Sequence, residues 1–136
     1  MQTVLLDTDV FSFFFKGDTR ASRYASDISG RQLCLCFQTV AELRMWAIWR
    51  NWNEERREKF SQTLRSYVVL PYDIAMADQW AEVTAHRKRI GKQILCGDAW
   101  IVAAALRHEI PLLTHNAKHF EDIPGLVVIS HQDQTT

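Results

Sequence analysis

Short apolar runs alternate along the chain with longer segments of mixed polarity. Each run is four to six residues long, and polar residues, glycine or proline flank it. Apolar runs of this length are typical of strands that a parallel sheet buries on both faces. They predict strands at residues 3–6, 32–37, 67–70, 111–114 and 126–129.

The segments between these runs have the periodicity of helices. They predict helices over residues 10–15, 20–28, 39–52, 54–65, 73–90 and 98–108. Lys16, Gly17 and Asp18 break the first pair, and Gly91 ends the fifth helix. The buried face expected for the fifth helix consists of Ile74, Ala77, Trp80, Ala81 and Thr84. The sixth helix is rich in alanine, which allows close packing against a sheet.

Strands that alternate with helices predict an α/β fold, with three α/β/α layers around a mostly parallel sheet. The chain has 136 residues, enough for one core and too few for two ordinary domains. No linker or repeat divides it. We therefore expect a single domain over residues 1–131, followed by a polar tail at 132–136.

Composition and charge narrow the class of protein. Apolar residues make up 47% of the chain, and the formal net charge is zero, which argues against coating nucleic acid by bulk charge. No apolar run is long enough for a membrane span, and no signal peptide is visible. Cys34, Cys36 and Cys96 lie among apolar residues, which favours reduced core thiols over a disulfide or a metal site. These features predict a cytoplasmic protein.

Three acidic residues stand where the carboxyl ends of strands should meet. Asp7 follows the first strand, Glu42 lies on the first turn of the helix after the second strand, and Asp98 opens the alanine-rich helix. Ligands of open parallel sheets bind at this edge. Carboxylates that converge there would repel one another unless a cation lay between them. Oxygen ligands alone favour Mg²⁺ or Mn²⁺.

Helix capping is the alternative explanation for each of these residues. Asp7 or Asp9 would cap a helix that begins at Val10, and Asp98 would cap the alanine-rich helix. Thr39 and Glu42 have the spacing of a capping box, in which the glutamate bonds to the first backbone N–H of the helix. Capping explains any one of the three well. A shared metal site explains why all three lie at one edge.

The chain resembles a known family through an ordered set of motifs. They are VLLDTD at residues 4–9, TVAEL at 39–43, GDAWIVA at 97–103, LTHNAKHF at 113–120 and IPGL at 123–126. In this order and spacing they resemble PIN-domain proteins, and are most similar to the VapC-type toxins of bacterial toxin–antitoxin pairs. The resemblance implies a metal-dependent endoribonuclease that hydrolyses RNA phosphodiester bonds.

The resemblance also implies roles for individual residues. Asp7, Glu42 and Asp98 match the acidic positions that hold Mg²⁺ or Mn²⁺, and Glu42 either binds the ion or acts as a base toward water. Thr8, Thr114 and Asn116 match the polar positions that support them. Asp9 stands where these toxins often have asparagine or serine. His119 replaces a fourth acidic residue, and is either a general acid or simply an exposed loop histidine.

Basic residues are candidates for contacts with RNA phosphates. Residues 86–92 contain no acidic side chain and lead toward Asp98. They contact phosphates, or they are a solvated helix end whose cations complement the helix dipole. Arg44 contacts phosphate or pairs with a carboxylate. The candidate RNA contacts are Arg44, Arg87, Lys88, Arg89 and Lys92.

The resemblance implies protein partners as well as RNA. The family forms homodimers and binds a small antitoxin, for which we expect a DNA-binding N-terminus. Trp46, Trp49 and Trp52 recur at every third residue, and such an aromatic stripe is typical of packing or of an interface. We assign them to these interfaces. The further candidates are Phe11, Phe13, Phe14 and Phe15.

Two other functions fit part of the sequence. Asp7 and Asp9 resemble the D-x-D motif of haloacid-dehalogenase-like phosphatases, but Phe11 and Val102 depart from that family's pattern. A PIN-like module that binds RNA without cleaving it is the second alternative. The presence of all three acidic positions counts against it.

Overall fold

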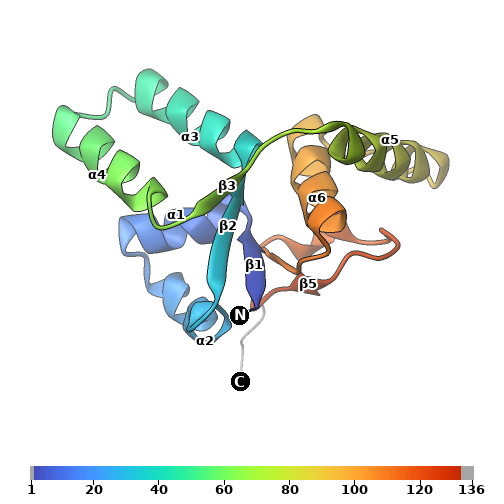
Figure 1. The fold of residues 1–136 in the computed structure, drawn as a ribbon, viewed down its shortest axis with the longest axis horizontal. Helices are drawn as coiled ribbons and strands as arrows, with labels where there is room; N and C mark the ends of the chain where they lie inside the picture. The colour runs from blue at the N-terminus through green and yellow to red at the C-terminus, as the bar shows by residue number, and fades with distance from the viewer. Residues whose placement is uncertain (1, 133–136) are drawn as a thin grey trace.

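A five-stranded parallel sheet forms the centre of the computed structural model, which describes residues 2–132 (Figure 1). The strand order is β3-β2-β1-β4-β5. The strands are β1 (Thr3–Leu6), β2 (Gln32–Cys36), β3 (Val68–Leu70), β4 (Leu112–Leu113) and β5 (Val128–Ile129). Most of the predicted tail lies outside the described residues, so the domain bounds stay a prediction.

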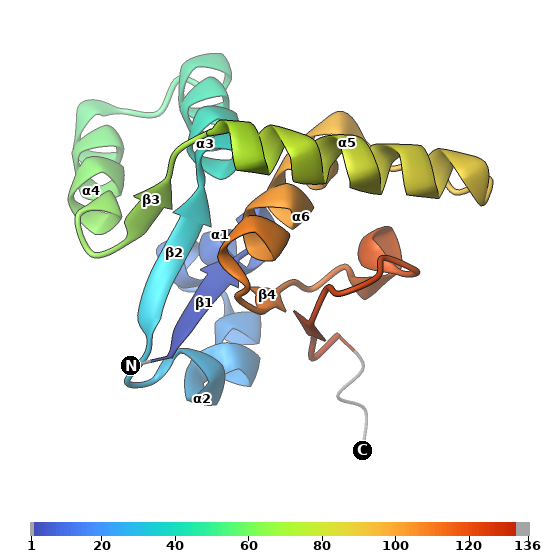
Figure 2. The ribbon, with the colours of Figure 1, turned by 45° about the vertical axis from the view of Figure 1, so that its right-hand side comes forward.

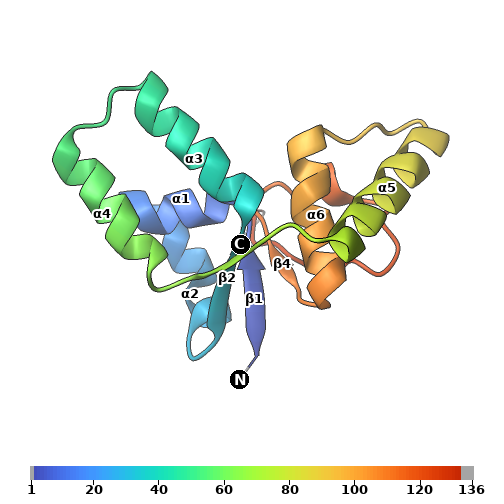
Figure 3. The ribbon, with the colours of Figure 1, turned by 45° about the horizontal axis from the view of Figure 1, so that its top comes forward.

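Helices cover both faces of the sheet, which confirms the predicted three-layer α/β/α fold. The α-helices are α1 (Thr8–Lys16), α2 (Ala25–Ile28), α3 (Phe37–Trp49), α4 (Glu54–Leu64), α5 (Ile74–Arg89) and α6 (Cys96–His108). Figure 3 shows α1 to α4 on one side of the sheet and α5 and α6 on the other. No helix within residues 2–132 is long and apolar enough to cross a membrane.

The parallel register brings the carboxyl ends of the strands to one edge. Leu6 of β1 is opposite both Leu35 of β2 and Leu113 of β4. Figure 2 shows β1 and β2 side by side, with their arrowheads at the same end. Residues that directly follow β1, β2 and β4 therefore lie near one another.

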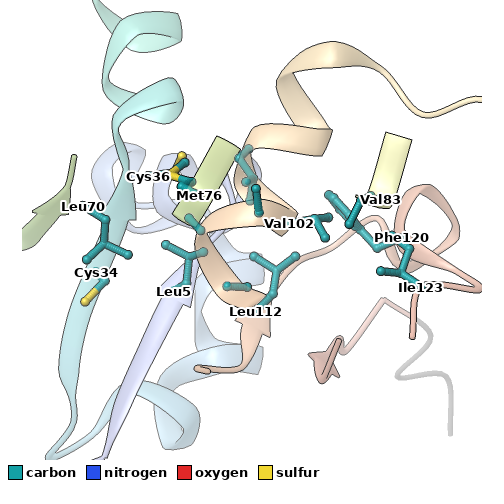
Figure 4. Close-up of a cluster of buried hydrophobic side chains, with 14 residues drawn as sticks. Leu5, Cys34, Cys36, Leu70, Met76, Val83, Val102, Leu112, Phe120 and Ile123 are labelled. Carbon is teal, nitrogen blue, oxygen red and sulfur yellow. The ribbon is translucent and has the colours of Figure 1, made fainter. Parts of the chain in front are cut away.

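The apolar layer beneath α5 and α6 combines the small side chains of α6 with larger ones from the sheet. Leu5, Cys34 and Leu112 are neighbours across three strands, and α6 lays its fully buried alanines, 103–105, over them. Figure 4 shows Leu5 and Leu112 below this helix. Burial raises the pKa of Cys36 to about 11, which keeps this core thiol protonated. Cys96 is exposed, so its prediction as a core thiol is wrong.

The opposite layer, between the sheet and α1, α3 and α4, is aromatic. The ring of Phe11 lies 6.0 Å from those of Phe15 and Phe60, and Trp52 stacks on Phe15 at 5.7 Å. Phe11, Phe13 and Phe15 are buried, so their assignment to an interface is wrong: they are core residues. Of the phenylalanines in α1, only Phe14 is partly exposed.

Three helices that bring acidic residues to the sheet edge begin two residues earlier than predicted. α1 begins at Thr8, α3 at Phe37 and α6 at Cys96. Thr39 therefore lies inside α3, Glu42 lies on its second turn, and no capping box forms. Asp98 is the third residue of α6 and does not cap it.

Two further helical predictions need correction. The segment predicted as a helix at 20–28 is a 3₁₀ helix over Thr19–Tyr24 followed by the short α2. The expected buried face of α5 is also wrong, because Ile74 is 80% exposed. The residues that α5 buries are Met76, Val83 and Arg87. Because Arg87 is one of these buried residues, the apolar periodicity of the sequence does not indicate this face.

Candidate active site

Asp7 is a buried carboxylate at the carboxyl end of β1. It is only 7% exposed. Its Oδ1 accepts a hydrogen bond from the backbone N–H of Thr8 at 2.8 Å, and its Oδ2 accepts one from Thr114 Oγ1 at 2.7 Å. Burial raises the pKa of Asp7 to about 7, and the charges of Asp9 and Asp98 also act to raise it. The two hydrogen bonds favour the charged form but do not offset this cost.

Glu42 is held by Thr8, the residue after Asp7, and by Gln38 of its own helix. Thr8 Oγ1 donates to Glu42 Oε2 at 3.0 Å and also lies 3.1 Å from Thr39 Oγ1. Gln38 Nε2 donates to Glu42 Oε1 at 3.1 Å. Glu42 Oε2 is therefore oriented from α1 and Oε1 from the preceding turn of α3, and neither oxygen bonds to the backbone at the helix N-terminus.

Asp98 reaches the same pocket from the first turn of α6. The preceding Gly97 lies so close to α3 that a Cβ there would be 3.1 Å from Glu42 Oε1. Desolvation raises the pKa of Asp98, and the charge of Glu42 adds to this rise. His119 acts in the opposite sense, because its Nδ1 lies 3.4 Å from Asp98 Oδ2. The structure thus brings Asp7, Glu42 and Asp98 within electrostatic reach of one another.

Asp9 and Asn116 serve the framework of this pocket. Asp9 Oδ1 accepts from the N–H of Val10 at 2.7 Å, and Oδ2 accepts from the N–H of His115 at 3.1 Å. Asp9 thereby ties α1 to the segment after β4. The backbone N–H of Asn116 donates to Thr114 Oγ1 at 3.1 Å, while its side chain is exposed. The extra carboxylate of Asp9 thus has a structural contact.

The oxygen ligands of the pocket fit a hard cation, but they do not lie close enough together to form a complete metal site. The three carboxylates supply only oxygen ligands, and burial, with a smaller contribution from neighbouring carboxylates, raises the pKa of Asp7 and Asp98, so that their charged forms are unfavourable without a cation. Within residues 2–132, however, no three histidine, cysteine, aspartate or glutamate side chains lie close enough to hold a metal ion.

The candidate RNA contacts do not form one exposed stripe. Arg87 is buried, and Lys92 pairs with Asp122 at 2.5 Å. Lys88 and Arg89 are exposed. Arg44 is also exposed, with its guanidinium 5.1 Å from the centre of the Phe60 ring. It makes no ion pair with a carboxylate in the described part of the chain.

Three residues of the pocket were not predicted as site residues. Gln38 orients Glu42, the fully buried Thr39 contacts Thr8, and Gly97 permits the approach of α6 to α3. The sequence held one usable signal, the polar pair Gln38 and Thr39 directly after an apolar strand. Placing that pair correctly requires the true start of α3.

Comparisons with known proteins assign the family. The model of the PIN domain matches residues 4–126. VapC ribonuclease Y4jK of Sinorhizobium fredii is 30% identical over 136 residues, covering 93% of this chain and 96% of the relative. Toxin FitB of Neisseria gonorrhoeae is 28% identical, covering 86% and 90%.

A solved structure supports the same fold. That of VapBC2 from Rickettsia felis, bound to a DNA fragment from its promoter, superposes with a TM-score of 0.85 at 17% identity, covering 96% of this chain and 99% of that one. The match of the PIN-domain model also excludes the haloacid-dehalogenase alternative. This chain belongs to the PIN-domain family and, within it, to the VapC ribonucleases.

Proposed function

We propose that this protein is a metal-dependent endoribonuclease and the toxin of a toxin–antitoxin pair. The observation that carries the proposal is the convergence of Asp7, Glu42 and Asp98 at the carboxyl edge of the sheet, where burial raises the pKa of Asp7 and Asp98. The ribonuclease and toxin names of the relatives support it. PIN-domain ribonucleases depend on a metal ion, and we propose Mg²⁺ or Mn²⁺ here.

Asp7, Glu42 and Asp98 would hold this ion. Once bound, a divalent ion lowers the pKa of water and neutralises charge on the phosphate. Asp98 is the ligand that can adjust its position, because within residues 2–132 its carboxylate contacts only His119. Asp7 and Glu42 are fixed by Thr114, Thr8 and Gln38.

The side chains of the chain itself would position the reactants. Thr8 and Gln38 direct both oxygens of Glu42, so Glu42 would either bind the ion or take up a proton from water without first reorienting. Thr114 holds Asp7 and keeps part of its negative charge in place. His119, half-exposed and 3.4 Å from Asp98, would donate a proton to the leaving oxygen.

We further propose a homodimer and a small cognate antitoxin as partners, in a cytoplasmic setting. The support within the fold is an exposed apolar patch on α3. Met45, Ile48 and Trp49 form it, and Trp49 is 71% exposed. Trp46 packs against Trp49 with ring centres 5.5 Å apart, whereas Trp52 belongs to the core. The interface assignment thus applies to the first two tryptophans only.

Cleavage of RNA by the purified protein tests this proposal. Labelled total RNA is incubated with the wild type in Mg²⁺, with the wild type in EDTA, and with Asp7→Asn in Mg²⁺. We expect fragments in the first reaction alone. Asp78→Asn is the matched control, because Asp78 is an exposed aspartate of α5, and it should cleave like the wild type.

Each alternative gives a different pattern. Binding of RNA by the wild type without any cleavage would favour the module that binds without catalysis. Equal cleavage by wild type and Asp7→Asn would show that the acidic pocket is not the active site.

A further inference from the structure

Arg87 is a charged side chain that the proposed reaction does not use. It lies on α5, is 6% exposed, and makes no ion pair with a carboxylate within residues 2–132. Arginine stays protonated under all ordinary conditions, so this is a permanent buried cation. A buried charge without an ionic partner is costly, and its retention calls for a ligand or a strong structural role.

Part of that role is visible, because Arg87 ties two loops together. Its Nε donates to the carbonyl of Lys92 at 2.6 Å, and its Nη1 donates to the carbonyls of His119 and Glu121 at 3.1 and 3.0 Å. The remaining nitrogen, Nη2, has no hydrogen-bond partner in the described residues. One end of a fixed guanidinium is therefore available to a ligand.

A cavity of about 230 Å³ lies between the same two loops. Its lining includes Arg87, Leu95, Asp98, Lys118 and His119. Lys118 is exposed and forms no ion pair within residues 2–132, and Leu95 presents an exposed apolar side chain. The cavity thus joins two cations and an apolar wall to a carboxylate of the proposed active site.

We propose that this cavity binds the nucleotide next to the scissile phosphate, with Lys118 and Arg87 contacting its phosphate group. The inference rests on the proposed ribonuclease function. When the scissile phosphate of an RNA chain lies at Asp98, the next nucleotide must lie on the adjoining surface. The cavity is located on that surface. Leu95 offers a flat apolar contact for the base or ribose.

Size and charge favour a nucleotide of a longer strand over other ligands. The cavity is smaller than the roughly 300–1,000 Å³ of sites that enclose a whole small molecule, so it suits one part of an extended substrate. Guanidinium and ammonium groups at a shared site match phosphate oxygens well. Part of the wall is also preorganised, since the Arg87 guanidinium donates hydrogen bonds to the carbonyls of Lys92, His119 and Glu121.

The test measures RNA affinity and RNA cleavage separately. Affinity is measured by fluorescence anisotropy with a fluorescein-labelled, mixed-sequence 12-nucleotide RNA in Mg²⁺, using variants in an Asp7→Asn background so that the RNA stays intact. We expect Lys118→Ala to weaken binding by about fivefold. It should also reduce the slope of log affinity against log salt by about 0.7, the value for one single-strand phosphate contact.

Two further variants control for charge and position. Lys118→Arg should restore both the affinity and the salt slope, because it keeps a cation in the cavity. Lys16→Ala removes an exposed lysine at the end of α1 and should change neither. In protein with Asp7 intact, Lys118→Ala should raise KM for RNA cleavage about fivefold with little change in kcat.

The outcomes separate this inference from the proposed function. If Lys118→Ala binds RNA as the wild-type background does, with an unchanged salt slope, the cavity is not a phosphate subsite. If the affinity loss occurs but no protein with Asp7 intact cleaves RNA, the cavity binds an RNA phosphate without a cleavage site beside it, and the ribonuclease proposal fails. If Lys16→Ala loses as much affinity as Lys118→Ala, binding depends on overall charge and the inference is wrong.

Discussion

Asp7 and Asp98 are supported in opposite ways. Asp7 is buried and accepts hydrogen bonds from the Thr8 backbone and the Thr114 hydroxyl. Asp98 is only partly buried, and within residues 2–132 its carboxylate contacts His119 alone, across an open cavity. The carboxylate of Asp7 is fixed by hydrogen bonds within the fold, whereas that of Asp98 can change its position when the substrate and the ion bind.

Because of this difference, Asp7 should contribute to both stability and activity, whereas Asp98 should contribute mainly to activity. Contacts that fix Asp7 cross from β1 to β4, so they belong to the fold as well as to the site. Asp98 can be changed with little effect on the fold, because hardly any of its contacts would be lost. Substitutions at the two positions should therefore separate effects on activity from effects on stability.

Replacing Asp98 by asparagine should greatly reduce activity and leave stability almost unchanged. We expect RNA cleavage to fall by about a thousandfold or more, since a ligand of the proposed ion is lost. The free energy of unfolding should not fall by more than about 0.5 kcal/mol, because the side chain has a single contact and its charge is partly desolvated. Urea unfolding and a cleavage assay measure the two quantities. A large loss of stability would show that Asp98 is part of the framework.

Replacing Asp7 by asparagine should abolish cleavage and stabilise the fold. Burial raises the pKa of Asp7 to about 7, so above that pH the folded protein holds a charge that it accommodates poorly. Asparagine removes the charge and can still accept a hydrogen bond from Thr114. At pH 8 in EDTA we expect about 1–3 kcal/mol of added stability, measured by urea unfolding. A less stable variant would mean that the hydrogen bonds outweigh the cost of burial.

The pH dependence of stability should follow from the same carboxyl group. In an unfolded chain Asp7 titrates near 3.8, whereas in the folded protein its pKa is about 7. Between these values the folded state binds more protons, so the free energy of unfolding should fall as pH rises from about 4 to about 7. Asp9 and Asp98, whose pKa values are also raised, add to this trend. Urea unfolding in EDTA at several pH values measures it.

A matched variant isolates the contribution of Asp7 to this trend. Asp7→Asn should flatten most of the pH dependence, and saturating Mg²⁺ should reduce it in the wild type. A wild-type profile that is flat, or that rises between pH 4 and 7, would contradict the raised pKa of Asp7.

The sequence predicts the layers of this fold well because local patterns encode them. The apolar runs of β1 and β2 indicate buried strands, and the alanines of α6 indicate close packing against the sheet. The buried face of α5 was mispredicted because Arg87 replaces an apolar residue there and binds loop carbonyls that lie far along the chain. A periodic sequence pattern cannot predict hydrogen bonds to loops that lie far away in the sequence.

The candidate site could be predicted from the sequence only in part. The placement of Asp7, Glu42 and Asp98 near one edge could be predicted, because parallel strands bring their carboxyl ends together. The contacts that orient Glu42 could not, since they depend on α3 beginning at Phe37 and on the close approach of Gly97. The aromatic run in α1 was misassigned because a buried aromatic layer and an exposed interface give the same sequence pattern.

Replacing Thr114 by valine should have a modest effect on stability. Thr114 is fully buried; its hydroxyl donates to Asp7 Oδ2 at 2.7 Å and accepts from the Asn116 N–H. Valine keeps the shape and loses both bonds. At pH 8 we expect a loss of about 1 kcal/mol in the free energy of unfolding, and a smaller loss at pH 5, where Asp7 is largely protonated. Urea unfolding at both pH values measures this. An equal loss at the two values would mean that the hydroxyl serves Asn116 and not the charge of Asp7, and Asp7 would then be no more firmly fixed by its neighbours than Asp98.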